Sequence, residues 1–291
     1  MEVNNKVNKV IKALFRSYKR DKEPFIISPN KNFSSRIYPF EEINLIKQLL
    51  FPKYWNCGYL TKEENKNELA LKIKELAHLF FEGIMPYFER EREVEKIVWE
   101  VLNNFGRVRE QLKKDVEAAY VGDPAARTYT EIIRSYPGFL AIEIHRVSHL
   151  FYSLGASGYA RELSEVVHSE TGIDIHPGAK IGDYFFIDHG TGVVIGETSV
   201  IGNWVRIYQN VTLGVLHFEK EDDGKIRKGY KRHPDIGNHV VIGAGAKILG
   251  PVKIGDYVNI GANSWITEDI PSYTSVFVAE HPRLEKRKKK R

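Results

Sequence analysis

Two different periods of apolar residues divide the chain near residue 172. Before it, apolar side chains recur every three or four residues, as at Val3, Val7, Val10, Leu14 and Tyr18, and again at Leu69, Ile73, Leu76 and Phe80. This spacing places them along one face of a helix, so the first part of the chain predicts amphipathic α-helices. The segment from about 21 to 40 contains three prolines and is expected to be a loop or an extended strap.

Turn residues predict where the last helices begin and end. Asp123-Pro124 is interpreted as an N-cap followed by proline in the first helical position. Pro137-Gly138 ends that helix and begins the next one. A further helix over 156–170 is expected to stop at Gly172. Together these signals predict an all-α domain over 1–172.

From Ile173 onward an aliphatic residue recurs every six positions, often followed by glycine. The positions are Ile175, Ile181 and Ile187, then Ile195, Ile201, Ile207 and Leu213, and then Ile236, Ile242, Ile248, Ile254, Ile260 and Ile266. A period of six fits short strands joined by tight corners, with one aliphatic side chain per face inside a prism. The thirteen positions predict about four three-sided coils of a parallel β-helix. The period leaves the hand of the coil open.

The fold class expected is therefore α+β, with helices first and the β-helix second. The β-helix domain spans 173–270, with a loop ejected at about 215–235, and a C-terminal tail covers 271–291. The last six residues of that tail are all basic.

The six-residue repeat is interrupted twice, and each interruption carries a histidine beside a charged residue. One step lengthens to eight residues and contains Asp188-His189; another lengthens to twenty-three and contains Arg232-His233. An unbroken prism presents only strand faces, so catalytic side chains are expected at the breaks. Imidazole titrates near neutral pH, which makes His189 the candidate general base. The structural alternatives are an Asx-type corner and a solvated loop.

Composition narrows the class of protein only slightly. The formal charge of the 291 residues is +5, but it is −1 without the six basic residues at the end. The basic character therefore belongs to the tail, and nucleic acid is not an expected partner. No apolar run approaches the roughly 20 residues of a membrane span. The N-terminus lacks the apolar core of a signal peptide, and the chain has a single cysteine, Cys57. The expected compartment is therefore the cytosol.

Several motifs together resemble the serine O-acetyltransferases of the hexapeptide-repeat acyltransferases. They are "DIHPGAKIG", "FFIDHGTGVVIGE", "VTLG", "KRHP" and "IGAGAKILG", within a similarity that runs from about residue 123 to about 267. The resemblance implies a left-handed β-helix, acetyl-CoA as co-substrate and no metal. It further implies L-serine as acceptor, O-acetylserine as product in cysteine biosynthesis, and L-cysteine as feedback inhibitor. Another hydroxyl acceptor such as homoserine or a sugar, a zinc hydratase and a silent scaffold remain as alternatives.

The resemblance also assigns roles to individual residues. For the acceptor these are His189 as base, Asp174 to orient it with Glu197 assisting, Asp188 and Asp123 for the serine ammonium, and Arg232 and His233 for its carboxylate. For the coenzyme they are Gly214, Ala244 and Ala262 along the pantetheine arm. Asn259 stands where many relatives have lysine, so the phosphates fall to Lys247, or to Arg227 or Lys228. His145 and His149, four apart on a helix, are expected to pack inside the helical part and not to bind metal.

The family implies a homo-oligomer, either a trimer or a dimer of trimers, with each active site between two prisms. Many relatives dock a C-terminus ending in isoleucine into O-acetylserine sulfhydrylase. Here the chain ends "VAEHPRLEKRKKKR". A terminal arginine is costly to desolvate, so no stable sulfhydrylase complex through this tail is expected.

Overall fold

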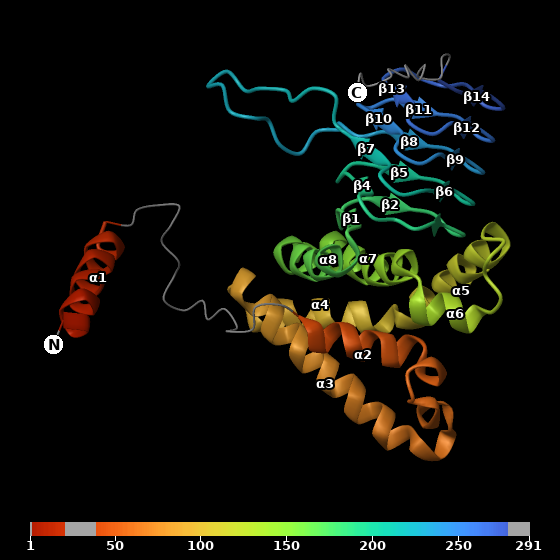
Figure 1. Cartoon of the computed structure of the whole chain (residues 1–291). Helices are drawn as coiled ribbons and strands as arrows, with labels where there is room; N and C mark the ends of the chain where they lie inside the picture. The colour runs from red at the N-terminus through yellow and green to blue at the C-terminus, as the bar shows by residue number, and fades with distance from the viewer. Residues whose placement is uncertain (1, 21–38, 279–291) are drawn as a thin grey trace, which may run out of the picture.

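A computed structural model describes residues 2–20 and 39–278 of the chain, with helices followed by stacked coils of strands (Figure 1). The strap expected from about 21 to 40 falls almost wholly outside the described residues. The basic end of the tail, within 279–291, also lies outside them. No helix of the described part is long and apolar enough to cross a membrane.

Eight α-helices and four short 3-10 helices precede the strands in the described ranges. The α-helices are α1 (Glu2–Tyr18), α2 (Phe40–Leu50), α3 (Lys66–Ile84), α4 (Glu91–Asn103), α5 (Phe105–Gly122), α6 (Tyr129–Ser135), α7 (Pro137–Ser153) and α8 (Ser157–Thr171). The 3-10 helices are η1 (Pro52–Tyr54), η2 (Gly58–Thr61), η3 (Glu63–Asn65) and η4 (Met85–Tyr87). The helices predicted from the two apolar runs are α1 and α3, and both are confirmed.

The ends of the later helices confirm two sequence signals and correct one. Helix α7 begins with Pro137, and α8 ends at Gly172, whose φ of 69° is the left-handed C-cap conformation. The N-cap assigned to Asp123 is wrong. The cap of α6 is Thr128, whose Oγ1 accepts a hydrogen bond from the backbone N–H of Glu131 at 3.1 Å. The helix is thus capped five residues later than expected, by a Thr-x-x-Glu motif, and Asp123 instead follows the last turn of α5.

Helices α7 and α8 form the layer directly beneath the strands, and α2, α3 and α4 lie below that layer (Figure 1). Helix α7 approaches the first coil closely at Gly138. A Cβ there would lie 2.2 Å from the carbonyl oxygen of Ile187, so only glycine fits. One cluster of buried apolar side chains continues from the helices into the prism. The helical layer and the first coil therefore share a core.

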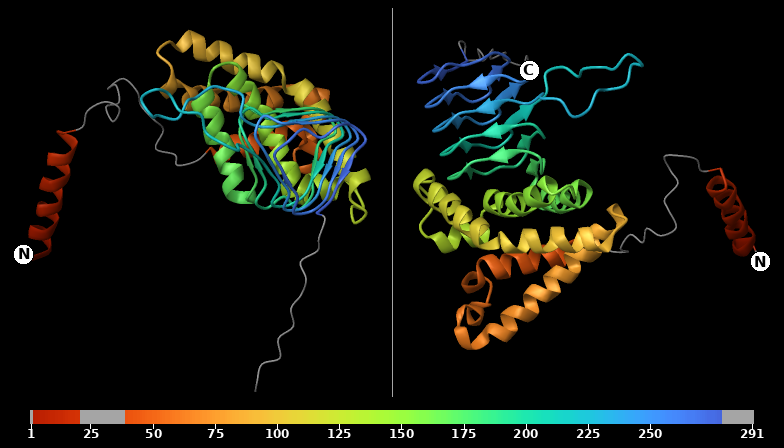
Figure 2. Two further views of the ribbon diagram at one scale, coloured as in Figure 1. Left: turned by 90° about the horizontal axis from the view of Figure 1, so that it is seen from above. Right: turned by 180° about the vertical axis from the view of Figure 1, so that it is seen from behind.

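Fourteen short parallel strands form the three faces of a prism, seen end-on in Figure 2. The first face holds β1 (Asp174–Ile175), β4 (Val194–Ile195), β7 (Thr212–Gly214), β10 (Lys247–Leu249) and β13 (Trp265–Ile266). The second holds β2 (Lys180–Ile181), β5 (Val200–Ile201), β8 (Asp235–Ile236) and β11 (Lys253–Ile254). The third holds β3 (Phe186–Ile187), β6 (Arg206–Ile207), β9 (Val241–Ile242), β12 (Asn259–Ile260) and β14 (Ser275–Val276).

The register confirms the hexad reading of the sequence. Ile175 pairs with Ile195, which pairs with Leu213, so the repeated aliphatic residue stacks on itself from coil to coil. The long insertion between β7 and β8 projects from the prism as a loop, as expected (Figure 1). Strand β14 pairs with β12 and lies beyond residue 270, so the paired strands continue past the expected end of the β-helix domain.

Candidate active site

The first interruption of the repeat forms the corner between the third and first faces, where β3 leads into β4. In later coils this corner has one left-handed residue two positions before the strand, namely Asn210, Gly245 and Asn263. In the interrupted coil Gly192 takes that position, and His189 (φ 57°) and Gly190 (φ 90°) are left-handed as well. Histidine adopts this conformation only seldom. The longer corner leaves the His189 side chain 71% exposed beside a largely buried Asp188.

Asp188 and His189, together with Asp123 and Tyr136, make up what we call the first cluster. Nε2 of His189 lies 3.8 Å from Oδ1 of Asp188. The Tyr136 hydroxyl donates a 2.5 Å hydrogen bond to Oδ2 of Asp123, and the backbone N–H of Ala125 donates one of 2.8 Å to Oδ1. The Tyr136 hydrogen bond lowers the pKa of Asp123, with smaller contributions from Ala125 and from the charge of nearby His189. The first cluster thus sets two carboxyl groups beside an exposed imidazole.

Asp174, expected to orient His189, makes its contacts elsewhere. It begins β1, and Nη1 of Arg161 from α8 lies 3.5 Å from its Oδ1. Within residues 39–278 no hydrogen bond or ion pair joins Asp174 to His189. Asp174 also lies close to Glu165 and His168, each offering one potential metal-ligand atom within 4.8 Å of the others. Arg161 pairs with Glu165 as well, so a guanidinium already compensates both carboxylates.

What we call the second cluster lies at the corner between the first and second faces and comprises Glu197, Thr198, Arg232, His233 and Tyr152. Nη2 of Arg232 pairs with Oε2 of Glu197, and the Tyr152 hydroxyl from α7 donates to Oε1 of Glu197 at 2.6 Å. Oγ1 of Thr198 accepts the backbone N–H groups of Arg232 and His233 at 3.0 and 3.1 Å. Thr198 therefore holds the end of the long loop against the corner.

His233 is buried and held in one tautomer. Its ring packs against the backbone of Gly196, where a Cβ would lie 2.1 Å from Nε2. Nδ1 accepts a hydrogen bond from the backbone N–H of Thr198 at 3.1 Å, so the neutral ring carries its proton on Nε2. Burial, and then the charge of Arg232, lower the pKa of His233 to about 4. At neutral pH His233 is therefore an uncharged hydrogen-bond donor.

The two clusters lie at opposite edges of the first face of one prism. The first cluster precedes β4 in the chain, and the second follows it. The intervening run of about five extended residues spans roughly 16 Å, since an extended residue rises about 3.3 Å. That span exceeds a small amino acid, so one chain cannot place both clusters around one such substrate.

The residues expected to contact the coenzyme divide between the same two edges. Ala244 and Ala262 lie at the corner between the third and first faces, just before β10 and β13. Gly214 ends β7 on the side of the second cluster. Nζ of Lys247 donates a hydrogen bond to the carbonyl oxygen of Asn210, one coil below. The residues expected to contact the coenzyme therefore lie at the same two edges of the first face as the first and second clusters.

Comparisons with known proteins agree with this geometry. A family model for the bacterial transferase hexapeptide (six repeats) matches residues 233–268. The plasmid serine acetyltransferase of Synechococcus elongatus is 53% identical, and the match covers 87% of this chain and 86% of that protein. The chain belongs to the serine acetyltransferase family.

Solved structures of family members share the fold. Serine acetyltransferase isoform 3 of Entamoeba histolytica, in complex with cysteine, is 44% identical, with a TM-score of 0.75 over 95% of this chain and 93% of that one. The Neisseria gonorrhoeae serine acetyltransferase in complex with serine is 30% identical, with a TM-score of 0.56 over 82% and 96% of the two chains. The expected family, the fold of helices followed by a left-handed β-helix, and the acyltransferase class are thus confirmed.

Three residues of the two clusters were not singled out from the sequence. Tyr136, Tyr152 and Thr198 position Asp123, Glu197 and the end of the long loop. None of them belongs to Asp188-His189 or Arg232-His233, the pairs that mark the two interruptions of the six-residue repeat. Only the packing of α7 reveals the two tyrosines: Tyr136, its N-cap, reaches Asp123 at the end of α5, and Tyr152 reaches Glu197 on the prism.

Proposed function

We propose that the protein transfers the acetyl group of acetyl-CoA to the hydroxyl of L-serine, giving O-acetylserine in the first step of cysteine biosynthesis. The observation that carries this proposal is the first cluster, which puts an exposed imidazole next to two carboxyl groups at the only eight-residue step in the described repeat. Acetyl transfer to an alcohol needs a base, and an amino-acid acceptor brings an ammonium group to be paired. Family membership supports the same reaction.

His189 acts as the general base in this proposal. Its imidazole takes the hydroxyl proton of serine while the oxygen attacks the thioester carbonyl. When the tetrahedral intermediate collapses, the carbon–sulfur bond breaks, and the imidazolium returns the proton to the departing thiolate. The side chain is 71% exposed, so it can reach a bound substrate. The buried His233, with its pKa lowered to about 4, suits a donor and not this base.

Asp188 and Asp123 pair with the serine ammonium. The Tyr136 hydrogen bond fixes the Asp123 carboxylate and lowers its pKa, which keeps it charged near neutral pH. Arg232 and the Nε2–H of His233 bind the serine carboxylate, since a guanidinium matches a planar carboxylate. Glu197 holds Arg232 in place from the other side.

The site is completed by a second chain. Because the two clusters lie at opposite edges of the first face, the first cluster of one prism meets the second cluster of its neighbour around a threefold axis. A trimer, or a pair of trimers, contains such interfaces. The coenzyme then lies in the groove between prisms, along Ala244 and Ala262 of one chain and Gly214 of the other.

The coenzyme phosphates need a cation near that groove. Lys247 begins β10, close to Ala244 at the corner between the third and first faces. In the single chain its Nζ donates to the carbonyl oxygen of Asn210. In the long loop Arg227 is paired with Glu219 at 2.9 Å, whereas Lys228 forms no ion pair among the described residues. Asn259 offers no charge. Lys247 and Lys228 are therefore the proposed phosphate contacts.

Thiol release from acetyl-CoA, measured with serine, homoserine and a panel of sugars, tests the proposal. Serine should give the highest kcat/KM, and preference for homoserine or a sugar would contradict it. Cysteine has the same ammonium and carboxylate as serine, so it should inhibit competitively with serine in the same assay. Insensitivity to cysteine well above the serine KM would contradict the assigned contacts.

A further inference from the structure

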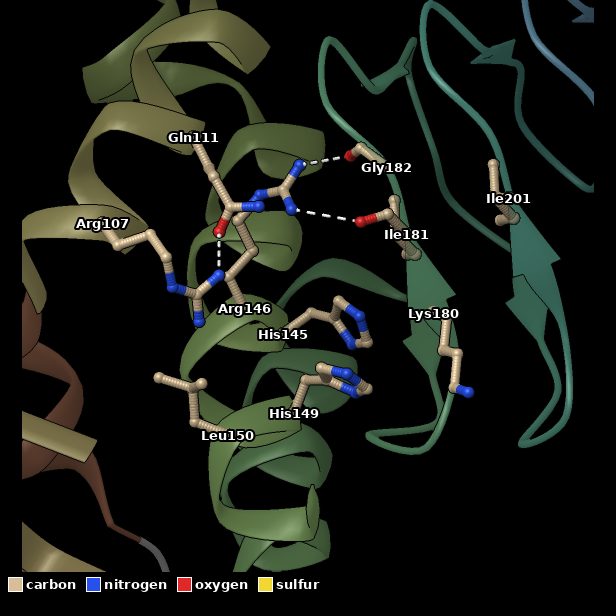
Figure 3. A pocket seen from close by; sticks show the side chains of 10 residues that line it. All are labelled: Arg107, Gln111, His145, Arg146, His149, Leu150, Lys180, Ile181, Gly182 and Ile201. Atoms are coloured by element: carbon tan, nitrogen blue, oxygen red, sulfur yellow. Dashed lines mark hydrogen bonds between the residues drawn. The ribbon is translucent and has the colours of Figure 1, made fainter. Parts of the chain in front are cut away.

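A cavity separate from the candidate active site lies between the helical layer and the base of the prism. Its volume is about 390 Å³, and it is bounded by α5, α7, β2 and the end of β5 (Figure 3). None of its lining residues belongs to either cluster of the candidate active site. Arg107 and Gln111 face it from α5, His145 and His149 from α7, and Lys180 from β2.

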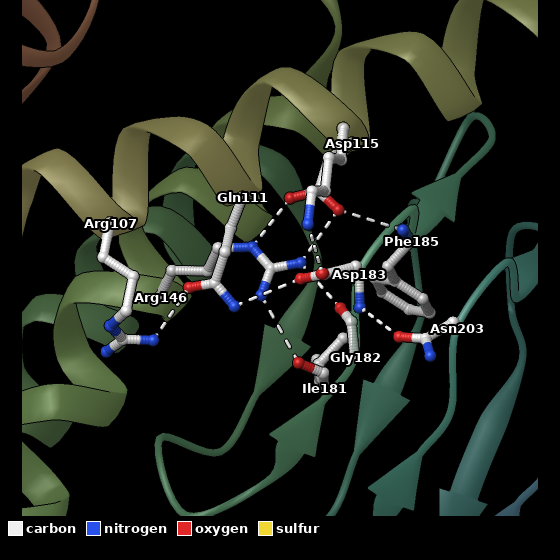
Figure 4. A network of polar contacts seen from close by, with 10 residues as sticks. Arg107, Gln111, Asp115, Arg146, Ile181, Gly182, Asp183, Phe185 and Asn203 are labelled. Atoms are coloured by element: carbon white, nitrogen blue, oxygen red, sulfur yellow. Dashed lines mark hydrogen bonds and ion pairs between the residues drawn. The ribbon is translucent and has the colours of Figure 1, made fainter.

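The cavity is basic. Of the described residues that line it, none is acidic, whereas Arg107, Arg146 and Lys180 are cationic. The charge of Arg146 is compensated, because its Nε and Nη2 donate to both carboxylate oxygens of buried Asp115 at 2.7 and 2.8 Å. Arg146 also donates to the carbonyl oxygens of Ile181 and Gly182, which fixes it between α7 and β2 (Figure 4).

The charges of Arg107 and Lys180 remain uncompensated. Arg107 donates to the amide oxygens of Asn104 and Gln111 at 3.0 and 3.2 Å, which hold it without neutralising it. Lys180 is exposed and takes part in no hydrogen bond or ion pair among the described side chains. The second acid of the network, Asp183, is already held by Lys114 at 2.7 Å and by Gln111 at 3.2 Å (Figure 4).

The floor of the cavity carries a buried polar atom without a partner. His145 is 4% exposed, and its Nδ1 has no hydrogen bond within the described residues. Buried polar groups of proteins are normally satisfied, so such an atom beside a cavity indicates a missing ligand. The ring also makes a hydrogen bond to the backbone of Ala179, so a proton on Nδ1 as well would make it an imidazolium, which a bound anion stabilises. His149 lies beside it, with ring centres 5.8 Å apart and Nδ1 bonded to the carbonyl oxygen of Pro177.

We infer that this cavity binds a multivalent oxyanion, a phosphate or sulfate group either free or carried by a small molecule. Arg107 and Lys180 supply the charge, and His145 supplies a hydrogen-bond donor at the floor. Helix α7 links the cavity to both clusters, since Tyr136 caps its N-terminus and Tyr152 lies in its last turn. A bound anion would therefore stabilise the helix that positions Asp123 and Glu197.

Calorimetry on the full-length assembly tests this inference, with inorganic phosphate, sulfate and glycerol 3-phosphate titrated at constant ionic strength. Saturable binding of at least one of them is expected. Lys180→Gln should weaken it about tenfold, since a charge-assisted hydrogen bond contributes more than a neutral one. Tighter binding of glycerol 3-phosphate than of phosphate would identify a carried group, and the reverse order would identify the free ion.

Two matched variants separate this site from other cations. Lys253 occupies the same position as Lys180 in a later coil of the second face, and Lys253→Gln should leave binding unchanged. Lys247→Gln removes one of the two proposed coenzyme cations and should likewise leave anion binding to the cavity unchanged. No saturable binding by the folded protein, or equal losses in Lys180→Gln and either control, would overturn the inference.

Discussion

Arg232 donates from Nη2 to Oε2 of Glu197, so the guanidinium proposed to bind the substrate carboxylate already has an anionic partner. Tyr152 donates to the other oxygen of the same carboxylate at 2.6 Å, and Nη1 of Arg232 donates to the carbonyl oxygen of Tyr230 at 3.3 Å. The guanidinium is therefore oriented before substrate binds. A serine carboxylate would share Arg232 with Glu197 and would not displace Glu197.

Replacing Glu197 by glutamine should disturb this orientation. Glu197→Gln removes the ionic partner of Arg232, and we expect the serine KM to rise about tenfold because hydrogen bonds to charged groups are the strong ones. The kcat should change much less, because His189 is untouched. Tyr152→Phe removes only one neutral donor and should raise KM less. Steady-state kinetics in which Glu197→Gln has a normal serine KM would contradict this role.

The base assignment predicts a large loss of turnover without loss of fold. His189→Asn suits the φ of 57°, because asparagine tolerates the left-handed conformation. We expect kcat to fall by about a hundredfold or more, as is usual when a general base is removed. His239→Asn is the matched control, since His239 has a φ of 56° at another corner of the prism. Near-normal kcat in folded His189→Asn would refute the assignment.

The role of Asp174 can be separated from its ion pair. If Asp174 orients His189 when substrate is bound, Asp174→Asn should lower kcat, though less than His189→Asn does, because the base remains. Arg161→Gln breaks the 3.5 Å contact with Asp174 and leaves the carboxylate in place. It should therefore have a smaller effect on kcat. Equal losses in the two variants would mean that Asp174 acts only through Arg161.

The sequence alone predicts the prism well, because its determinant is local and repeated. Each aliphatic residue of the hexads stacks on its counterpart one coil away, so a fixed period of six is sufficient to stack Leu213 on Ile195 and Ile266 on Ile248. The interruptions are equally visible, since they break a regular rhythm. For this reason the sequence alone singles out Asp188, His189, Arg232 and His233 as candidate site residues.

Contacts between elements that are distant along the chain are not encoded in that way. Tyr136 reaches Asp123 because the start of α7 lies beside the end of α5, and Tyr152 reaches Glu197 because α7 lies beneath the first coil. No spacing in the sequence records this packing. Asp123 shows the same limit. A carboxylate before proline is a common helix cap, yet Thr128 takes that role and leaves Asp123 to Tyr136.

Buried Glu143 on α7 predicts an unusual pH dependence of stability. The side chain is 1% exposed, Oε1 has no partner within the described residues, and burial raises its pKa to about 8 against a weaker opposing effect of Lys47. A carboxyl with a raised pKa contributes its full stability below the unfolded value of 4.5 and loses it as pH rises through about 8.

Glu143→Met removes the titrating group at similar volume. We expect its Tm to exceed that of the wild type by an amount that grows from pH 5 to pH 8.5, since only the wild type must keep a buried acid protonated. Glu95→Met, an exposed position on α4, should show no such trend. A Tm difference for Glu143→Met that is constant with pH would contradict the expected titration.

The division of the site between two chains makes the strongest prediction about assembly. His189→Asn disables the first cluster of a chain, and Arg232→Gln disables its second cluster. Each variant alone should be nearly inactive. In a mixed trimer one interface joins the intact first cluster of an Arg232→Gln chain to the intact second cluster of a His189→Asn chain.

Random mixing therefore restores activity in a defined amount. Three-quarters of the trimers formed from equal parts contain both variants, and each of these has one intact site of three, so about a quarter of the wild-type kcat is expected. The two chains should be denatured and refolded together, because preformed trimers do not exchange freely when their interfaces are stable. Chains refolded separately and then mixed are the control. Light scattering must show the same oligomer in both samples. Absence of rescue in a co-refolded trimer would show that each chain carries a complete site, and full activity of a monomer would refute the shared site altogether.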